Sequence, residues 1–383
     1  MRFPEFGGEW EKHSLGEIGS TLIGLTYSPA DVVKEDGVIV LRSSNIQDGE
    51  IDYKDLVRVN KKIKDSLFTK KNDILICARN GSSRLIGKNA LISDDDTGHS
   101  YGAFMMMYRS EDNPFVRQLL CTKRYFAQVG ENLGARINQI TTSDMNSFEF
   151  FFPQSKEERH KVASFLRLID ERISTQKKII EKYESLIRGI SNNLLYADNG
   201  TPVRIGNILK ERVEKTKANN QHEVLSSTVK GIFSQREYFS KDIASENNIG
   251  YKVIRLHDVV LSPQNLWMGN INYNDRFDVG IVSPSYKIFT IADGYNKTFI
   301  ASMLKTHRAL YNYILVSEQG ASVVRRNLNM EAFEQLVFKM PSLDLQRKIG
   351  NAILTLKSQL ETANGIKLAY ESQKQWLLMR MFI

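Results

Sequence analysis

The sequence has 383 residues, enough for two or three domains that each bury a core. Its 42% hydrophobic and 25% charged residues are typical of a folded globular chain and argue against a disordered or fibrous one. The net charge of +8 favours a polyanionic partner, such as nucleic acid or an anionic membrane face.

Two cysteines, Cys77 and Cys121, are too few for a disulfide framework. No apolar run approaches the length of about 18 residues that a membrane helix needs, and the first residues do not resemble a secretion signal. We therefore expect a cytoplasmic protein with reduced thiols.

Residues 1–152 are expected to form a mixed α/β (α+β) domain that is rich in strands. Short apolar runs flanked by turn residues predict strands at 38–41, 74–76 and 104–108. A helix is predicted at 113–128, with Pro114 near its first turn. The apolar run 148–152 ends the domain at Pro153.

Residues 153–196 are predicted to form one long helix. Apolar residues recur at alternating steps of four and three, which is the heptad spacing that keeps one stripe of a helix against a partner helix. The stripe is Val162, Leu166, Ile169, Ile173, Gln176, Ile180, Tyr183, Ile187, Ile190 and Leu194, with only Gln176 polar. A helix of some 40 residues would be roughly 60 Å long, more than the width of a small domain, so it needs a partner.

The same order of segments recurs in the second half of the chain. Residues 197–340 are predicted to form a second domain, and 341–383 a second long helix. Tyr183-Glu184-Ser185 recurs as Tyr370-Glu371-Ser372. Residues 15–18 correspond to 205–208, 73–76 to 258–261, and Gly134-Ala135 to Gly320-Ala321. These matches predict a tandem repeat of domain and helix.

The two helices are predicted to pair as an antiparallel coiled coil with pseudo-twofold symmetry. A domain of about 140 residues spans roughly 40 Å, so it cannot return the chain to the start of a parallel helix. The domains would then lie at opposite ends of a rod. The second helix matches less well, since Lys367, Lys374 and Gly365 interrupt it, and the alternative is two unrelated amphipathic helices. The expected helix interface, which would also bind partner subunits, comprises Val162, Leu166, Ile169, Ile173, Ile180, Tyr183, Ile187, Ile353, Leu356, Leu360, Tyr370 and Leu377.

Motifs of catalysis and metal binding are absent from the sequence. The Gly-rich stretch 81–89 has the wrong spacing for a phosphate loop, and no histidine pair has zinc spacing. The chain contains no Gly-x-Ser-x-Gly and no Pro-Pro, which an adenine methyltransferase loop requires. We expect no catalytic residue, no metal site and no cofactor bound by this chain.

Polar, basic and aromatic residues gather in corresponding loops of both predicted domains. Such side chains contact base edges and phosphates, although any one of them alone is equally compatible with a solvated loop. The candidate DNA-binding residues are Arg42, Ser44, Asn45, Arg79, Asn80, Ser82, Arg84, Arg136 and Asn138 in the first domain, and Ser226, Thr228, Lys230, Gln264, Asn265, Trp267, Arg325 and Arg326 in the second.

The chain resembles the specificity subunits of Type I restriction–modification systems over its whole length. The opening 2–10, the strand motifs at Asp73 and Asp258, and the helix start from Pro153 through 158–166 to Asp170 carry this resemblance. Arg159 stands where the family usually has Gln, and the second copy at 345–350 keeps Gln346 but lacks the Glu. The departures weaken the helix motif and leave the loops untouched.

The resemblance implies a DNA-binding subunit without catalytic activity, in which each domain is a target recognition domain. Each domain would read one half of a split, asymmetric double-stranded DNA sequence, and the helices would set the spacer between the halves. It implies two modification subunits that use S-adenosylmethionine and two restriction subunits that use ATP and Mg. Two other classes remain open: a structural adaptor with two protein-binding domains on a rod, and a self-contained DNA methyltransferase or nuclease.

Overall fold

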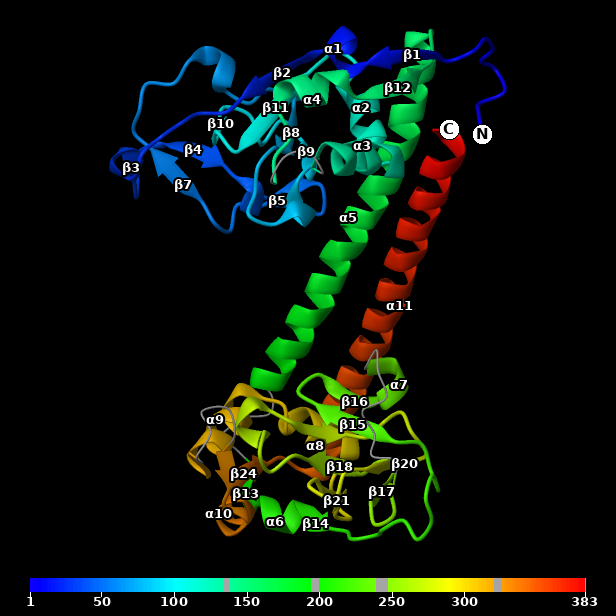
Figure 1. Cartoon of the computed structure of the whole chain (residues 1–383). Helices are drawn as coiled ribbons and strands as arrows, with labels where there is room; N and C mark the ends of the chain where they lie inside the picture. The colour runs from blue at the N-terminus through cyan, green and yellow to red at the C-terminus, as the bar shows by residue number, and fades with distance from the viewer. Residues whose placement is uncertain (134–137, 194–199, 239–246, 320–325, 383) are drawn as a thin grey trace. The chain divides into compact units, whose positions relative to one another are not determined.

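The computed structural model describes residues 1–133, 138–193, 200–238, 247–319 and 326–382 (Figure 1). Contacts divide the chain into two compact units: unit 1 is Met1–Gln176 with Ile366–Ile383, and unit 2 is Lys177–Gly365. The division falls within the two long helices, so the predicted boundaries at 152, 196 and 340 stay predictions. Among the described residues, no helix is long and apolar enough to cross a bilayer.

The core of unit 1 is built on an antiparallel sheet. In spatial order its strands are β2 (Ser20–Ile23), β11 (Met105–Arg109), β8 (Ile74–Cys77) and β9 (Asn89–Leu91). Strand β8 is apolar throughout because both of its faces are covered. Ile74 and Ile76 pack in one core, and Leu75 and Cys77 pack in another. The strands predicted at 74–76 and 104–108 are therefore confirmed, with small shifts at their ends.

A second, mixed sheet in unit 1 lies against the other face of β8. Its strands are β10 (Ser100–Tyr101), β4 (Val38–Leu41), β7 (Val57–Val59) and β3 (Val32–Val33), with β10 parallel to β4. The hairpin of β5 (Ile46–Gln47) and β6 (Glu50–Ile51) follows β4. Buried Leu41 and Ile46 join Leu75 in the shared core. The strand predicted at 38–41 is confirmed.

The shorter helices of unit 1 are α1 (Leu15–Ile18), α2 (Asn113–Leu119), α3 (Lys123–Leu133) and α4 (Thr142–Ser147). The prediction of one continuous helix over 113–128 is wrong, because the chain breaks between α2 and α3. The Thr122 hydroxyl donates to the Leu119 carbonyl at 2.6 Å and accepts from the Tyr125 N–H at 3.3 Å. Such side-chain bonds to the backbone compete with the continuing helix and end it here.

The two long helices are α5 (Lys156–Asn193) and α11 (Leu343–Met381). Each begins shortly after its predicted start, because a serine follows the proline and caps the helix. The Ser155 hydroxyl accepts from the Glu158 N–H at 3.1 Å, and the Ser342 hydroxyl from the Leu345 N–H at 3.4 Å. Immediately before each helix, a strand pair closes the unit: β1 (Glu11–Ser14) with β12 (Glu149–Phe152), and β13 (Thr201–Arg204) with β24 (Val337–Met340).

Within unit 1, the first part of α5 packs against the last part of α11. Lys374 is an ion-pair partner of Asp170, and the Arg172 guanidinium lies 5.7 Å from the centre of the Tyr370 ring. As the residue numbers increase along α5, those of the contacting residues in α11 decrease, so these segments are antiparallel. The shared core contains Val162, Leu166, Ile169, Ile173, Leu377, Leu378 and Met381. A coiled coil over the full length of both helices stays a prediction.

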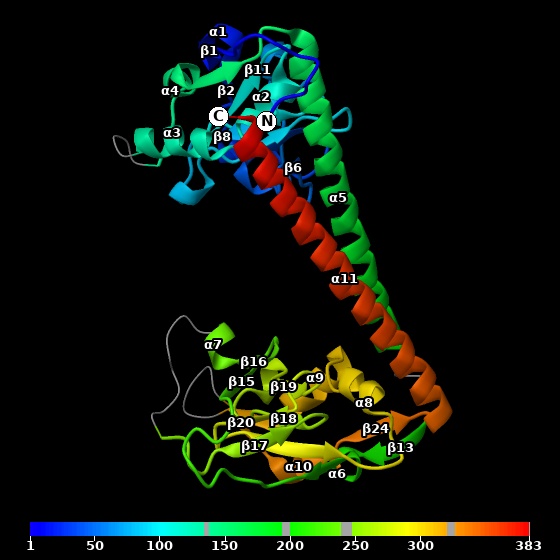
Figure 2. The ribbon, with the colours of Figure 1, turned by 90° about the vertical axis from the view of Figure 1, so that its right-hand side faces the viewer.

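Unit 2 repeats the plan of unit 1 (Figure 2). Its main antiparallel sheet has the order β14 (Leu209–Glu211), β21 (Lys287–Ile291), β18 (Val259–Leu261) and β19 (Ile271–Tyr273). Helices α6 (Ile205–Ile208), α8 (Lys297–Met303), α9 (His307–Leu315) and α10 (Met330–Gln335) follow the order of α1 to α4. The predicted correspondences of 15–18 with 205–208 and of 74–76 with 259–261 are confirmed as α1 with α6 and β8 with β18.

Helices α1 and α6 each contain a glycine at the same position, and close packing requires it in both units. A Cβ on Gly16 would lie 3.1 Å from the Cβ of Asn146, and a Cβ on Gly206 would lie 3.1 Å from that of Glu334. Asn146 belongs to α4 and Glu334 to α10, so in each unit a glycine lets the first short helix approach the last one closely.

Further strands of unit 2 form the hairpin of β15 (Leu225–Thr228) with β16 (Gly231–Ser234), and the pair of β17 (Lys252–Arg255) with β20 (Val279–Val282). The short helix α7 (Gln235–Tyr238) follows β16, and β22 (Ser317–Gln319) pairs with β23 (Arg326–Leu328). Buried Leu225, Ile254 and Val282 pack in one core against Val260, on the face of β18 opposite Val259.

Candidate nucleic-acid interface

Three of the predicted loops of unit 1 meet at one place. The Asn80 side-chain amide donates to the Ser43 hydroxyl at 2.9 Å, and the Asn80 backbone N–H donates to the Asn138 carbonyl at 3.3 Å. The Asn138 side-chain amide donates in turn to the Gly81 carbonyl at 3.0 Å. We call residues 42–45, 79–84 and 138–140, together with Phe104, the junction of unit 1. The structure therefore brings together loops that the sequence could only name separately.

The side chains of the loop 42–45 have two different roles. Asn45 is buried, and its amide donates to the carbonyls of Asp52 and Asp55, each at 2.9 Å. Its side-chain oxygen accepts from the Arg42 N–H at 2.9 Å, so Asn45 holds the loop in shape. Arg42 forms an ion pair with Asp55 at 2.7 Å, whereas Ser44 is exposed. Among the predicted residues of this loop, only Ser44 and Arg42 are open to a ligand.

The junction of unit 1 also contains an aromatic residue that the sequence analysis missed. Phe104 is 60% exposed, and the guanidinium of Arg79 lies 5.3 Å from the centre of its ring. Its carbonyl accepts from the backbone N–H groups of Ala78 and Arg79, at 3.0 and 2.9 Å. The apolar run at 104–108 predicts a strand that starts at Phe104, which hid this residue among the core positions. Gly102, two residues earlier, was the available signal for a turn.

Unit 2 brings the corresponding two loops together. The Arg326 backbone N–H donates to the Gln264 carbonyl at 3.3 Å, and the Arg326 guanidinium lies 4.7 Å from the centre of the Trp267 ring. Trp267 belongs to the short 3-10 helix η5 (Leu266–Met268), and Asn265 precedes it. We call residues 262–270 together with 326–329 the junction of unit 2. Asn80 lies three residues after the end of β8, and Gln264 lies three residues after the end of the corresponding strand β18.

The hairpin of β15 and β16 is tied to this junction. The Lys305 amino group donates to the carbonyl of Gly269 at 2.9 Å and to that of Val229, at the hairpin turn, at 3.4 Å. Although part of the Lys305 side chain is open to solvent, desolvation around its amino group lowers its pKa to about 8, with Lys357 adding repulsion. Lys230 is exposed beside Val229, and Thr228 is half-buried.

Other predicted residues lie outside this arrangement. Ser226 is buried and accepts a bond from the Gln235 amide at 3.1 Å, so it cannot face a ligand. Tyr273, near Trp267 in the sequence, stacks on His257, and its hydroxyl lies 2.6 Å from the His257 Nδ1. The predicted residues Arg136 and Arg325 lie outside the described part of the chain, as do Gly134-Ala135 and Gly320-Ala321. Ser82 and Arg84 are exposed in the junction of unit 1.

A buried carboxylate fixes the strand that precedes each junction. Asp73 forms an ion pair with Arg109 at 2.8 Å and accepts from the Lys70 N–H at 2.9 Å. Asp258 accepts from the Arg255 N–H at 2.6 Å and is an ion-pair partner of Arg212. In both units the aspartate accepts from the backbone N–H three residues before it. The arginine differs, because Arg109 belongs to β11 whereas Arg212 follows β14.

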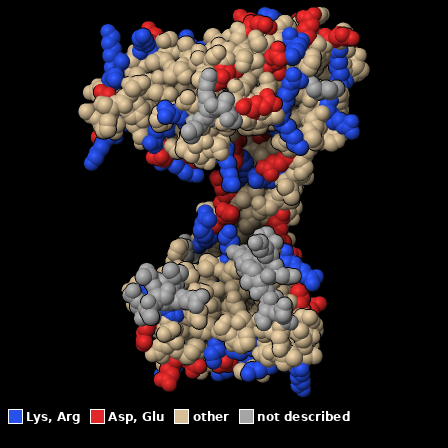
Figure 3. All heavy atoms as spheres, viewed as in Figure 1, with Lys and Arg blue, Asp and Glu red and all other residues tan. Residues whose placement is uncertain are grey.

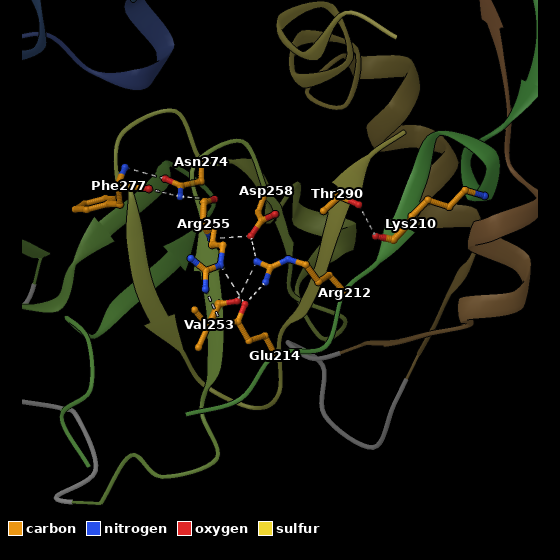
Figure 4. A network of polar contacts seen from close by, with 9 residues as sticks. All are labelled: Lys210, Arg212, Glu214, Val253, Arg255, Asp258, Asn274, Phe277 and Thr290. Carbon is orange, nitrogen blue, oxygen red and sulfur yellow. Dashed lines mark hydrogen bonds and ion pairs between the residues drawn. The ribbon is translucent and has the colours of Figure 1, made fainter. Parts of the chain in front are cut away.

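Figure 4 shows the network around Asp258. Glu214 binds both Arg255, at 2.8 Å, and Arg212, and hydrogen bonding from Arg255 lowers the pKa of the Glu214 carboxyl. The Asn274 amide donates to the carbonyls of Arg255 and Phe277, at 2.9 and 2.7 Å. These contacts link the segment after β14 to the turn between β17 and β18.

All of the predicted helix-interface residues are withdrawn from solvent. Val162, Leu166, Ile169, Ile173, Ile353 and Leu377 are buried, and Ile180, Tyr183, Ile187, Leu356, Leu360 and Tyr370 are half-buried. Lys374, which interrupts the apolar stripe of the second long helix, is also buried and forms an ion pair with Asp170. Apolar residues on the outward face of the unit 1 helix segments are instead exposed, namely Leu168, Leu368, Trp376 and Met379.

Charge alone does not mark a binding surface. Figure 3 shows Lys and Arg interspersed with Asp and Glu over the visible face of each unit. In the described part of the chain, no group of three or more His, Cys, Asp or Glu side chains is placed to hold a metal ion. What the two units share is therefore a pair of loop junctions, each with polar side chains, an arginine and an aromatic ring, and this composition suits base edges and phosphates.

Comparisons with known proteins agree with this arrangement. Residues 7–185 match the family described as the Type I restriction modification DNA specificity domain. The chain is 23% identical over 259 residues to the specificity subunit of the Type I restriction enzyme EcoKI from Escherichia coli (strain K12), covering 65% of this chain and 54% of that protein. It is 24% identical over 203 residues to the StySPI specificity subunit from Salmonella potsdam, covering 49% and 42%. The matches thus span about half the length of these relatives.

A solved structure extends the likeness to the whole fold. The Type I restriction–modification S subunit from M. genitalium superposes with a TM-score of 0.61 at 15% identity, covering 100% of this chain and 99% of that one.

Proposed function

We propose that this chain is the DNA-reading subunit of a Type I restriction–modification complex, a proposal supported by the match of residues 7–185 to the Type I restriction modification DNA specificity domain. Unit 1 would read one half of a bipartite, asymmetric duplex sequence and unit 2 the other. The observation that carries this proposal is the repeated junction: two units with one strand plan bring the same two loops together.

The different side chains at the two junctions account for an asymmetric target. Unit 1 offers Ser44, Asn80, Ser82 and Arg84, and unit 2 offers Thr228, Lys230, Gln264 and Asn265, so the units would select different bases. A bidentate contact to the right base contributes about 1–3 kcal/mol of discrimination. Because the units are covalently linked, binding of one half-site makes engagement of the other effectively intramolecular.

Catalysis would belong to partner subunits. We propose that this chain binds no cofactor, that modification subunits supply S-adenosylmethionine-dependent methylation of adenine, and that restriction subunits supply ATP- and Mg-dependent cleavage. The complex would act in the cytoplasm. The long helices would set the spacer between the half-sites, as expected from the resemblance.

The modification subunits would dock on the outward faces of the helices. The predicted interface residues are buried or half-buried, so the exposed residues Leu168, Leu368, Trp376 and Met379 are the better candidates. Leu368→Asp with Trp376→Asp should reduce co-purification of a modification subunit. Gln373→Asp, which adds a charge at an exposed polar position of the same helix, should not. Equal recovery with both variants would contradict this docking face.

The function is tested by mapping N6-methyladenine across the genome in cells with and without this gene, with its modification subunit present. We expect methylation at a bipartite motif that depends on the gene. Substitutions in the junction of unit 1 should alter one half of the motif only. A methylation pattern indifferent to the gene would contradict the proposal.

A further inference from the structure

We propose that the arginine–aromatic pair at each junction is the part of the unit that contacts the bases, with Arg79 and Phe104 in unit 1 and Arg326 and Trp267 in unit 2. In each pair the guanidinium would donate to O6 and N7 of one guanine, and the ring would pack beside it. This inference rests on the proposed function and deepens it, because it assigns Phe104 as a DNA-contacting residue and names the base.

The backbone holds the pair of unit 1 firmly. The Phe104 carbonyl accepts from two consecutive N–H groups, of Ala78 and Arg79, at 3.0 and 2.9 Å. Arg79 also forms an isolated β-bridge with Gln139, which joins the second loop of the junction. Phe104 nevertheless leaves 60% of its surface exposed. The hydrogen bonds therefore fix the backbone of Phe104, while its ring stays open to a ligand.

The pair of unit 2 is built from different elements at the corresponding place. Here the segment after β18 supplies the ring of Trp267, and strand β23, before α10, supplies Arg326. In unit 1 the loop after the central strand supplies Arg79 instead. Since the parts come from different positions of the repeat, the recurrence does not follow from the shared strand plan. The geometry points to a common requirement for an arginine lying on a ring.

The other arginine–aromatic contacts in the described residues differ in place or in pairing. Those of Arg172 with Tyr370 and of Arg380 with Trp376 lie on the long helices, away from the loops. In two further contacts the guanidinium already has a partner within the chain. Arg276 lies 5.0 Å from the Phe277 ring centre, but it is paired with Glu237 at 2.8 Å. Arg124 lies 5.2 Å from that of Phe151, and its Nε donates to the Glu149 carbonyl at 3.1 Å. For Arg79 and Arg326, no carboxylate lies within ion-pair distance among the described residues. The described residues therefore leave both guanidinium forks unoccupied.

Stacking prepares the guanidinium for this contact. The planar fork of arginine matches guanine O6 and N7, which is the commonest specific contact in the major groove. A guanidinium that already lies on a ring loses less side-chain freedom when it binds. The ring can then cover the neighbouring sugar or thymine methyl with apolar surface.

The test uses the full-length chain together with its modification subunit and randomised duplex DNA. Sequencing of bound duplexes defines the preferred motif, and fluorescence anisotropy at fixed salt measures affinity for the motif and for single-base changes. We expect Arg79→Ala and Phe104→Ala to lose about 10-fold or more of the preference at the same position of the same half-site. Arg326→Ala and Trp267→Ala should do so in the other half.

The base is identified by replacing the guanine at that position with 7-deazaguanine, which lacks the N7 acceptor. The wild-type chain should bind the altered duplex more weakly, and Arg79→Ala should show no further loss, because the two changes remove the same contact. Arg79→Lys should keep the salt dependence but lose the preference. Phe104→Tyr, which keeps an aromatic ring at this position, should retain the base preference.

Arg276→Ala and Arg124→Ala are the matched controls, and both should leave the motif unchanged. If the wild-type chain selects a motif but the Arg79 and Phe104 variants select it equally well, this inference fails while the proposed function stands. If the wild-type chain selects no motif, both fail.

Discussion

The carboxylate of Glu158 in α5 is held in two places by the guanidinium of Arg2, with Nε–Oε1 at 2.7 Å and Nη2–Oε2 at 2.6 Å. The indole N–H of Trp10 donates to the same carboxylate at 3.2 Å. Glu158 is 1% exposed, although it lies in the first turn of the helix. The first ten residues and the helix start, which carry the family resemblance separately in the sequence, are therefore one structural site.

Glu158→Gln should destabilise unit 1 by about 1–3 kcal/mol, because it weakens charge-assisted hydrogen bonds that are shielded from water. Urea unfolding followed by tryptophan fluorescence measures the loss. Glu5→Gln is the matched control, since Glu5 pairs with Lys161 at the exposed surface, where ion pairs contribute little. An equal effect of both substitutions would show that Glu158 is not a buried anchor.

Asp73→Asn should destabilise unit 1 by about 2–4 kcal/mol, because it leaves the largely buried Arg109 without its carboxylate. Asp258→Asn should destabilise unit 2 by less, because Arg212 keeps its ion pair with Glu214. Hydrogen exchange read by mass spectrometry can assign the loss to the unit that carries the substitution. Asp94→Asn, which breaks the exposed pair with Lys71, should change stability by less than about 1 kcal/mol. Loss of protection in both units from one substitution would contradict their independence.

Lys305 should make unit 2 more stable as the pH rises from about 8. Its folded pKa of about 8 lies below the ordinary value of 10.5, so between these values the unfolded chain binds more protons than the folded one. The free energy of unfolding, relative to Lys305→Met, should therefore rise over this range. We expect a rise of about 1 kcal/mol, because solvent screens the partly exposed side chain. A difference that is constant with pH would contradict the lowered pKa.

The two cysteines should differ in reactivity. Cys77 is fully buried and burial raises the pKa of its thiol to about 11, whereas Cys121 is partly exposed. At pH 8, iodoacetamide should alkylate Cys121 at least about 10-fold faster, as followed by mass spectrometry of the peptides. In denaturant the two rates should converge. Equal rates in the folded chain would be the contrary result.

The sequence was sufficient for the features that repeat along the chain. The heptad stripe from Val162 onward, the strand at 38–41 and the match of 15–18 with 205–208 follow from local spacing, because burial of one helix face or one strand imposes a period on neighbouring residues. It also placed Arg79, Asn80, Gln264 and Trp267 in the loops that carry the candidate site. It failed at Thr122, where one hydroxyl ended a helix that periodicity alone would continue.

Only the tertiary structure decided which residues meet. Phe104 lies on Arg79 from 25 positions away, and Arg2 binds Glu158 from 156 positions away. The same aspartate takes its arginine from β11 in unit 1 and from the segment after β14 in unit 2. These contacts depend on how the sheets and helices pack, and no period along the chain records that packing. The sequence by itself determined the repeated helices and strands, and the tertiary packing decided which of their side chains contact one another.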